Sequence, residues 1–273
     1  MRVSNEMARH LMLAAIFTTL MACDGSVRKE DSMVKQVVIS AAEWESLAHK
    51  RVIFGHQSVG QNIIDGVQAL AAGAKVALPV VRSRSFGESA GIMHFYVGEN
   101  ENAVSKLRDF SNALESGGVR PGDAIMVKFC YLDFNRNTDS RRLAGEYVDT
   151  LDRLGRRFPD ASFVAVTAPL TVVQTGPKAW VKRILGREPS GYGDNARRLE
   201  FNNLLRARYR GSGQLFDLAA IEAQGTGENQ YEGQTIESLN SSLTYDDGHL
   251  SAHGAQVVGA HLVKYLAALP GRR

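Results

Sequence analysis

The sequence predicts an α/β protein with a mostly parallel sheet that is covered by helices on both faces. Short apolar runs of strand character alternate with longer stretches in which apolar residues recur at helical spacing. Strands joined through helices run parallel, because each connection has to cross back to the starting end of the sheet. The chain has 273 residues, of which 44% are hydrophobic and 22% charged. This length and composition suit one domain of ordinary globular type.

The elements can be placed in chain order from their patterns. Ser40-Ala41-Ala42-Glu43 is a capping box, which predicts a short helix through Trp44 and Leu47. The expected strands are residues 52–54, 75–81, 124–129, 162–167 and 215–218. The expected helices are residues 61–72, 104–114, 143–154 and 199–205, and a last helix follows Ser251 as its N-cap and passes through Tyr265.

Two connections are longer than packing requires, residues 170–195 and 224–244. Long loops in compact domains are often lids or binding loops. The first loop contains Trp180, Tyr192 and several Lys and Arg residues, a composition that suits a sugar or an acidic polymer. An ordinary solvated helix around Trp180 to Leu185 explains the same composition, and both readings stay open.

The N-terminus has the pattern of a secretory signal. Arg2 and Arg9 precede an apolar stretch at residues 11–17, and the segment ends in Leu20-Met21-Ala22-Cys23. This ending resembles a bacterial lipobox, in which Cys23 becomes the acylated first residue of the mature chain. We therefore expect a signal peptide at 1–22, a tether at 23–39 and a folded domain at 40–270. We expect a membrane-anchored lipoprotein that faces the periplasm or the cell exterior. Plain secretion is the alternative.

Charge and cysteine content exclude some classes of protein. The formal net charge of +3 and the absence of a basic run predict no binding to nucleic acid. With Cys23 lipidated, Cys130 has no partner for a disulfide, and its position at the end of an apolar run predicts a buried small side chain. The sequence makes no prediction about the oligomeric state.

Two distant segments carry the residues for nucleophilic acyl transfer. Ser58 lies where an apolar strand turns into a helix, and Asp246 and His249 lie three residues apart in a glycine-containing loop. A serine becomes a nucleophile when an imidazole takes its proton and a carboxylate orients that imidazole. Gly60 would let the helix start close beneath Ser58, with backbone N–H groups facing a developing oxyanion.

Each residue also has a structural explanation. Ser58 could cap a helix, Asp246 could hold a turn and His249 could be an interior histidine. Asp246, His249 and His253 could instead be metal ligands, although no further ligand group of suitable spacing is present. His56 could act as a base, but neighbouring strand residues point to opposite faces. The conjunction of serine, Asp-x-x-His and the α/β pattern favours the triad.

On these residues the chain resembles the SGNH/GDSL hydrolase superfamily, from about residue 50 to 268 in element order. Asp246 and His249 match the Asp-x-x-His-Leu block, and Ser58 matches the nucleophile, although Gly-His-Gln-Ser stands in place of Gly-Asp-Ser. Gly98 is similar to the second-block glycine of the oxyanion hole. The third-block asparagine is missing from Cys130-Tyr131-Leu132-Asp133, and Asn100 is the expected substitute, with Asn135 and His56 as rivals.

The resemblance implies a flavodoxin-like three-layer α/β/α sandwich with a mostly parallel five-stranded sheet. It also implies an extracytoplasmic serine esterase without metal or cofactor, whose substrate is an O-acyl ester on a small molecule or, most plausibly, on a carbohydrate. Acyl transfer to a polysaccharide by the same residues is an alternative. A non-catalytic glycan-binding module with this fold is another, which the two altered blocks favour.

Overall fold

The computed structural model describes residue 34 and residues 37–270. The predicted signal peptide, Cys23 and most of the expected tether lie outside the described residues. Residues 37–270 belong to one compact unit, and the buried hydrophobic clusters lie within it. None of the helices described is long and apolar enough to cross a bilayer.

Helices and strands alternate through most of the described chain. In chain order they are α1 (Ala41–Ala48), β1 (Arg51–His56), α2 (Ser58–Gly73), β2 (Val80–Arg82), β3 (Gly91–Tyr96), α3 (Ala103–Gly117), β4 (Ala124–Val127), the short helix η1 (Tyr131–Asp133), α4 (Ser140–Arg157), β5 (Ser162–Val166), α5 (Gly176–Ile184), α6 (Tyr192–Arg208), β6 (Leu215–Phe216), α7 (Leu218–Glu222), β7 (Asn229–Tyr231), β8 (Gln234–Ile236), η2 (Ser241–Leu243) and α8 (Ala252–Ala268).

The central sheet has six strands in the order β2-β3-β1-β4-β5-β6, and all neighbouring pairs are parallel. The α/β class is therefore confirmed, while the expected count of five strands is wrong. The missed strand is β3, in which every residue from Gly91 to Phe95 is buried. Its His94 interrupts an otherwise apolar run, and the structure explains this histidine by a hydrogen bond to His56.

Other boundaries differ from the expected ones. The strand expected at 75–81 is only the short edge strand β2, and the helix expected at 61–72 begins at Ser58. Within the second long connection, β7 and β8 form a small antiparallel hairpin that the sequence did not predict. The capping box at Ser40 and the N-cap at Ser251 are both present, as expected.

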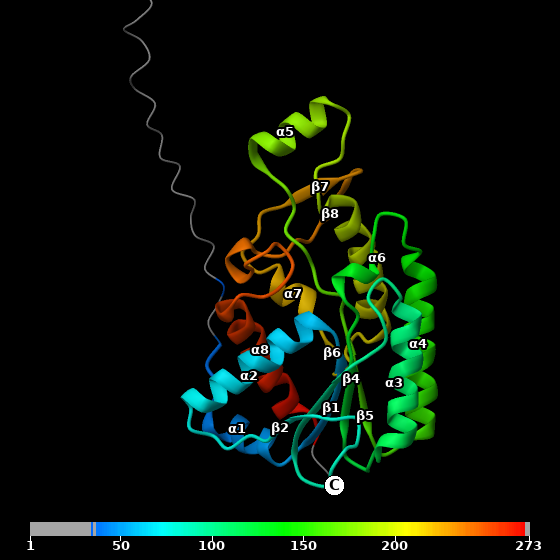
Figure 1. Ribbon diagram of the computed structural model, residues 1–273, viewed down its shortest axis with the longest axis vertical. Coiled ribbons are helices and arrows are strands. Elements are labelled where there is room, and N and C mark those ends of the chain that lie inside the picture. Colours follow the sequence, from blue (N-terminus) through cyan, green and yellow to red (C-terminus); the bar gives the residue numbers. More distant parts are fainter. Residues whose placement is uncertain (1–33, 35–36, 271–273) are drawn as a thin grey trace, which may run out of the picture. The chain divides into compact units, whose positions relative to one another are not determined.

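The helices form two layers, one on each face of the sheet (Figure 1). One buried cluster joins α1, α2, α7 and α8 to side chains such as Phe54, Met126 and Val164. The other joins α3, α4 and α6 to Ile53, Ile125 and other residues that alternate with the first set along the same strands. Because successive strand residues point to opposite faces, each central strand contributes to both clusters.

The order of the strands fixes where a ligand can bind. After β1 the chain passes through α2 to β2 and β3 on one side of β1, and then through α3 to β4 on the other side. In parallel sheets, ligands bind beyond the carboxyl ends of the strands at such a reversal of strand order. Ser58 follows β1 directly and lies at this point, as does the segment after β4 that contains Tyr131.

The helices that follow Ser58 and His249 pack unusually close together. A Cβ atom at Gly66 of α2 would lie 2.0 Å from the carbonyl oxygen of Ala255 in α8, and one at Gly259 would lie 3.0 Å from the backbone nitrogen of Val67. Glycine at these contacts therefore lets the two backbones approach each other. The close packing couples α2, which starts at Ser58, to α8, which starts just after His249.

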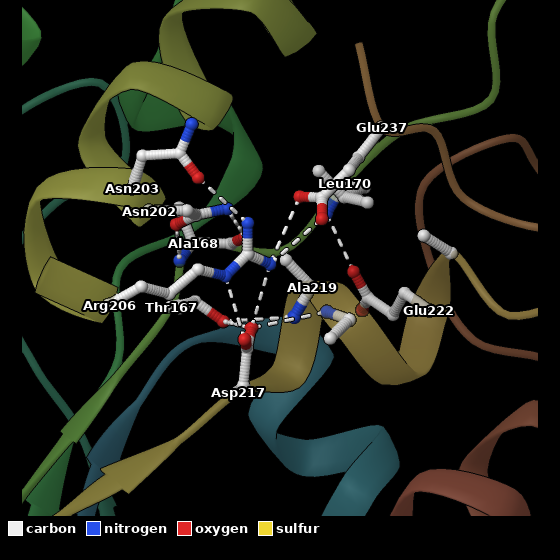
Figure 2. A network of polar contacts seen from close by, with 12 residues as sticks. Thr167, Ala168, Leu170, Asn202, Asn203, Arg206, Asp217, Ala219, Glu222 and Glu237 are labelled. Carbon is white, nitrogen blue, oxygen red and sulfur yellow. Dashed lines mark hydrogen bonds and ion pairs between the residues drawn. The ribbon is translucent and has the colours of Figure 1, made fainter. Parts of the chain in front are cut away.

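A buried polar network holds the segment that follows β5 (Figure 2). Asn202 of α6 accepts a hydrogen bond from the N–H of Ala168 at 2.7 Å and donates to its carbonyl oxygen at 3.1 Å. One side of the network is an ion pair between Arg206 and Asp217 at 2.7 Å. Thr167 donates to Asp217 at 3.1 Å, so the end of β5 is tied to both α6 and α7.

Candidate active site

Three residues from two distant parts of the chain form one hydrogen-bonded row. The Oγ atom of Ser58 lies 2.9 Å from Nε2 of His249. On the other side of the ring, Nδ1 of His249 lies 2.6 Å from Oδ2 of Asp246. These distances are within hydrogen-bonding range. Ser58 and His249 are 191 positions apart, and the fold brings them together.

The loop of Asp246 is built around that carboxylate. Its Oδ1 atom accepts hydrogen bonds from the backbone N–H groups of His249 at 2.7 Å and Gly248 at 3.1 Å. Asp247, which lies between Asp246 and Gly248, has a φ angle of 71°. This is a left-handed conformation that Asp adopts more readily than most residues. Partial burial raises the pKa of Asp246, but the bonds from the His249 backbone and ring outweigh it and leave the pKa below the usual value. Asp246 is therefore ionised at neutral pH. Its side chain is 40% exposed, which also favours the charged form.

Two tyrosines enclose the ring of His249. The Tyr131 ring meets it edge-on with 5.4 Å between the ring centroids, and Tyr245 stacks on it at 5.9 Å. Burial raises the pKa of Tyr131 to about 12, so its hydroxyl stays protonated. A Cβ atom at Gly248 would lie 2.9 Å from the Tyr131 ring, which explains why the loop has a glycine beside His249.

His56 is a structural residue in this arrangement. It is completely buried, and burial lowers its pKa to about 3, so the ring is neutral. Its Nδ1 atom donates to the carbonyl oxygen of Gln57 at 2.8 Å, which leaves Nε2 to accept from Nδ1 of His94 at 3.0 Å. A Cβ atom at Gly60 would lie 2.3 Å from the His56 side chain, so Gly60 allows α2 to start close to β1.

Gln57 ties the turn before Ser58 to the neighbouring loop. Its amide nitrogen donates to the carbonyl oxygens of Val97 at 2.6 Å and Gly98 at 2.9 Å. On the far side of Ser58, Asn62 accepts a hydrogen bond at 3.2 Å from the backbone of Leu250, next to His249. The positions of Ser58 and His249 are therefore fixed by side chains whose sequence pattern carries no recognisable signal.

The expected oxyanion donors are engaged elsewhere. The N–H of Gly98 donates to Asp109 at 2.8 Å, and the amide oxygen of Asn100 accepts from Lys106 at 3.1 Å. A role for Gly98 stays a prediction, and it requires the N–H to leave Asp109. To donate to an oxyanion, Asn100 would have to use its amide nitrogen, since its amide oxygen accepts from Lys106. Ser58 is the first residue of α2, and the side chain of its N-cap Gln57 forms no capping bond. The first N–H groups of a helix have no acceptor within it, so this end of α2 can supply donors.

A buried ion pair joins the two loops beside the site. Lys106 and Asp133 have no exposed side-chain surface and lie 2.7 Å apart. Lys106 also holds Asn100, and Asp133 accepts from the backbone N–H of Cys130 at 2.7 Å. The pair thus fixes the loop after β3 relative to the loop after β4. Cys130 itself is buried, as expected.

A cleft of about 610 Å³ opens beside the Asp246–His249 loop. The connection between β5 and α6 contributes part of its wall, and Asn195 fixes that wall by bonding both the N–H and the carbonyl oxygen of Thr171. The lining is mostly polar and comprises Glu101, Tyr131, Leu132, Phe134, Asn135, Thr171, Val172, Gln174, Ser190, Gly191, Asp194, Arg198, Asp246, Asp247 and Gly248. Its four carboxylates against one guanidinium make the cleft acidic.

Arg198 of α6 closes the floor of the cleft. It is 2% exposed and donates to the carbonyl oxygen of Tyr131 at 2.8 Å and to Thr171 at 2.8 Å. The guanidinium thus connects the segment after β4 with the segment after β5. Across the described part of the chain, no group of three or more His, Cys, Asp or Glu side chains is arranged to hold a metal ion.

Comparisons with known proteins give similarities of fold. No family model matches the sequence, and no curated protein matches it. Among solved structures, the chain is similar to a member of the lipolytic protein G-D-S-L family from Veillonella parvula, with 12% identity, a TM-score of 0.45 and coverage of 79% of this chain and 96% of that one. It is also similar to a Clostridium thermocellum family 3 carbohydrate esterase, with 13% identity, a TM-score of 0.44 and coverage of 81% and 99%.

A third similar structure is the periplasmic domain of a Salmonella ser. Paratyphi A lipopolysaccharide acetyltransferase, with 13% identity, a TM-score of 0.40 and coverage of 82% of this chain and 87% of that one. At these identities and TM-scores, the likeness does not assign an activity or a substrate to this chain.

Proposed function

We propose that the protein is an extracytoplasmic serine esterase that hydrolyses O-acyl esters through Ser58, His249 and Asp246. The observation that carries this proposal is the row of hydrogen bonds, 2.9 Å from Ser58 to His249 and 2.6 Å from His249 to Asp246. A serine, an imidazole and a carboxylate in this order form the arrangement that activates a hydroxyl for acyl transfer. Its position at the reversal of strand order supports the proposal independently.

Each residue has a defined part in the proposed reaction. The carboxylate of Asp246 keeps the proton of His249 on Nδ1, so that Nε2 is free to accept the proton of Ser58. The Ser58 oxygen then attacks the ester carbonyl, and the resulting imidazolium gives its proton to the leaving alcohol. Water, activated by the same imidazole, releases the acyl group from Ser58 in the second half of the reaction.

The developing oxyanion needs donors close to Ser58. The backbone N–H of Ser58 at the start of α2 is the first candidate, because the dipole of the helix also favours a negative charge there. Gly98 and Asn100 are the further candidates: the N–H of Gly98 would have to leave Asp109, whereas Asn100 would donate with its amide nitrogen while its oxygen stays on Lys106.

The composition of the cleft supports a neutral, hydroxyl-rich substrate. Asn135, Gln174 and Ser190 offer donors and acceptors, and Tyr131 offers an aromatic surface. The acidic lining disfavours anionic groups, because like charges repel across a cleft of low dielectric constant. An O-acylated neutral carbohydrate fits these properties best, ahead of lipids and small esters.

The proposal is tested by labelling and by hydrolysis. A fluorophosphonate probe should label Ser58, as seen by mass spectrometry, and p-nitrophenyl acetate should be hydrolysed by the unaltered protein but not by the Ser58→Ala or His249→Ala variants. Equal rates in all three proteins would remove the triad. Failure of the probe to react, together with measurable binding of sugars, would instead support a non-catalytic glycan-binding module. Transfer of the acyl group to a glycan instead of to water would identify an acyltransferase.

The location is part of the proposal. The basic start, the apolar stretch at residues 11–17 and Leu20-Met21-Ala22-Cys23 support export with a lipid on Cys23. Incorporation of radiolabelled fatty acid into the unaltered chain, but not into a Cys23→Ser variant, is the expected result. Absence of label from the unaltered protein in a lipoprotein-processing host would favour a plain secreted enzyme.

A further inference from the structure

An apolar patch lies on the helix α5, outside the candidate active site. Trp180 and Ile184 are 63% and 62% exposed, and Val181 and Leu185 are exposed as well. No other segment of the described residues exposes four large apolar side chains within six consecutive positions. Patches of exposed apolar side chains on otherwise polar surfaces mark sites of interaction.

The patch faces away from the domain because of how α5 is attached. Ala179 is buried, and Arg183, one helical turn later, lies over the ring of Tyr192 at 5.4 Å and donates to its hydroxyl at 3.1 Å. This pair of residues defines the face that rests on the domain. Trp180 and Ile184 are also one turn apart, on a different face of the helix. In the view of Figure 1, α5 is the outermost helix at the top.

The segment that carries the patch is positively charged. Residues 176–187 contain Lys178, Lys182, Arg183 and Arg187 and no acidic residue. Lys178 and Arg187 form no ion pair among the described residues. Glu188, which follows, is engaged by Arg136 at 3.1 Å, so its charge is partly compensated. The segment therefore combines exposed apolar side chains, one of them tryptophan, with several cations.

We propose that α5 docks onto the surface of a bilayer that contains anionic phospholipids. A protruding helix with a tryptophan and aliphatic side chains on one face, flanked by lysine and arginine, matches the polarity of a membrane interface. The apolar side chains enter the boundary between head groups and acyl chains, and the cations remain among the anionic head groups.

The docking helix is attached to the wall of the cleft beside the candidate site. The segments before and after α5 are joined by a hydrogen bond from the N–H of Gln174 to the carbonyl oxygen of Ser190 at 2.9 Å. Both residues line the cleft beside Asp246. The helix that docks is therefore continuous in the chain with the wall of that cleft. The docking itself does not depend on the proposed esterase activity, and Ser58→Ala should bind vesicles as the unaltered protein does.

The test uses the compact unit from residue 33 onward, so that no N-terminal lipid contributes to binding. The chain has two tryptophans, of which Trp44 is 5% exposed and Trp180 is 63% exposed. Vesicles of phosphatidylcholine with phosphatidylglycerol should shift the tryptophan emission to shorter wavelength and should sediment the protein. A Trp180→Phe variant should still sediment but should lose the emission shift, because the remaining tryptophan is buried.

Two variants address the two parts of the patch. Ile184→Ser with Leu185→Ser should weaken vesicle binding at least tenfold. Lys178→Gln with Arg187→Gln should weaken it about fivefold for each charge removed, and added salt should remove most of the difference.

Matched controls lie elsewhere on the domain. Val104→Ser removes another exposed apolar side chain, and Arg156→Gln with Arg210→Gln removes the same charge near the ends of α4 and α6 that precede β5 and β6. Both control proteins should bind vesicles as the unaltered protein does. Hydrolysis of a soluble ester, or the circular dichroism spectrum if no hydrolysis is found, shows that each variant is folded.

Three results would overturn the proposal. The first is no emission shift and no sedimentation with the anionic vesicles. The second is equal binding by the α5 variants and the controls. The third is self-association that rises with protein concentration and is abolished by Ile184→Ser with Leu185→Ser, since this would make a second copy of the chain the occupant of the patch.

Discussion

Replacing Asp246 by asparagine tests the proposed mechanism most directly, because it changes one charge with little change in shape. The Oδ1 atom of asparagine can still accept from the backbone N–H groups that Asp246 binds now. The amide nitrogen, however, would stand 2.6 Å from Nδ1 of His249, where the carboxylate accepts a proton today. Two donors cannot face each other at that distance, so the ring would move its proton to Nε2. Nε2 would then be unable to take the proton of Ser58.

The size of the effect follows from the exposure of the carboxylate. For a buried carboxylate of a triad, the same substitution lowers kcat by about 10⁴. The Asp246 side chain is 40% exposed, so water screens its interaction with the imidazolium. For charges about 4 Å apart near a protein surface, with an effective dielectric constant of about 20–30, an interaction of about 3–4 kcal/mol is expected. We therefore expect Asp246→Asn to lower kcat about 10²- to 10³-fold, with KM little changed.

The assay is the release of p-nitrophenol from its acetate ester, with Asp247→Asn as the matched control. Asp247 has the same charge and lies next in the chain, and its φ of 71° is one that asparagine tolerates. Its replacement should change kcat by less than about threefold, because the structure shows no bond from its side chain to His249. A loss of less than tenfold for Asp246→Asn, in a protein with an unchanged circular dichroism spectrum, would refute the role given to the carboxylate.

Three further predictions concern stability. Asp133→Asn should lower the free energy of unfolding in urea by about 3–5 kcal/mol, because it leaves the fully buried charge of Lys106 uncompensated; a loss below 1 kcal/mol would contradict this. Burial raises the pKa of Glu222 to about 8, so the unfolded state ionises first and stability falls as pH rises. Between pH 6 and 8 the loss is about 2 kcal/mol, and Glu222→Gln should abolish this slope in urea titrations. Gly66→Ala should lower the melting temperature and the esterase rate, because its Cβ would lie 2.0 Å from the backbone of α8. Gly73→Ala, with open space around it, is the control and should be neutral or slightly stabilising. Equal melting temperatures of the two variants would contradict the close packing of α2 and α8.

The sequence predicted most of the fold because the helices and strands have strong periodic patterns. The capping box at Ser40 and the N-cap at Ser251 are local signals that tertiary packing did not override. The strand β3 was missed because its central polar residue, His94, looks unfavourable until its partner His56 is known. A contact between residues 38 positions apart leaves no mark in the local pattern of either segment.

The sequence also predicted part of the candidate site. Ser58, Asp246 and His249 carry their chemistry in their residue types, so the sequence alone suggested that they meet. The supporting residues do not: Gln57 and Asn62 act through bonds to backbone atoms of distant loops. Their importance is a consequence of tertiary geometry, and only the structure identifies them.

The unusual residues before Ser58 have a physical explanation in this geometry. His56 is neutral, its Nδ1 donates to Gln57 and its Nε2 accepts from His94, so the turn before the serine is held from inside the sheet. Gln57 then holds the loop at Val97 and Gly98 by two further bonds. The Gly-His-Gln-Ser segment therefore fixes the serine and the neighbouring loop together, and the triad geometry follows from that attachment.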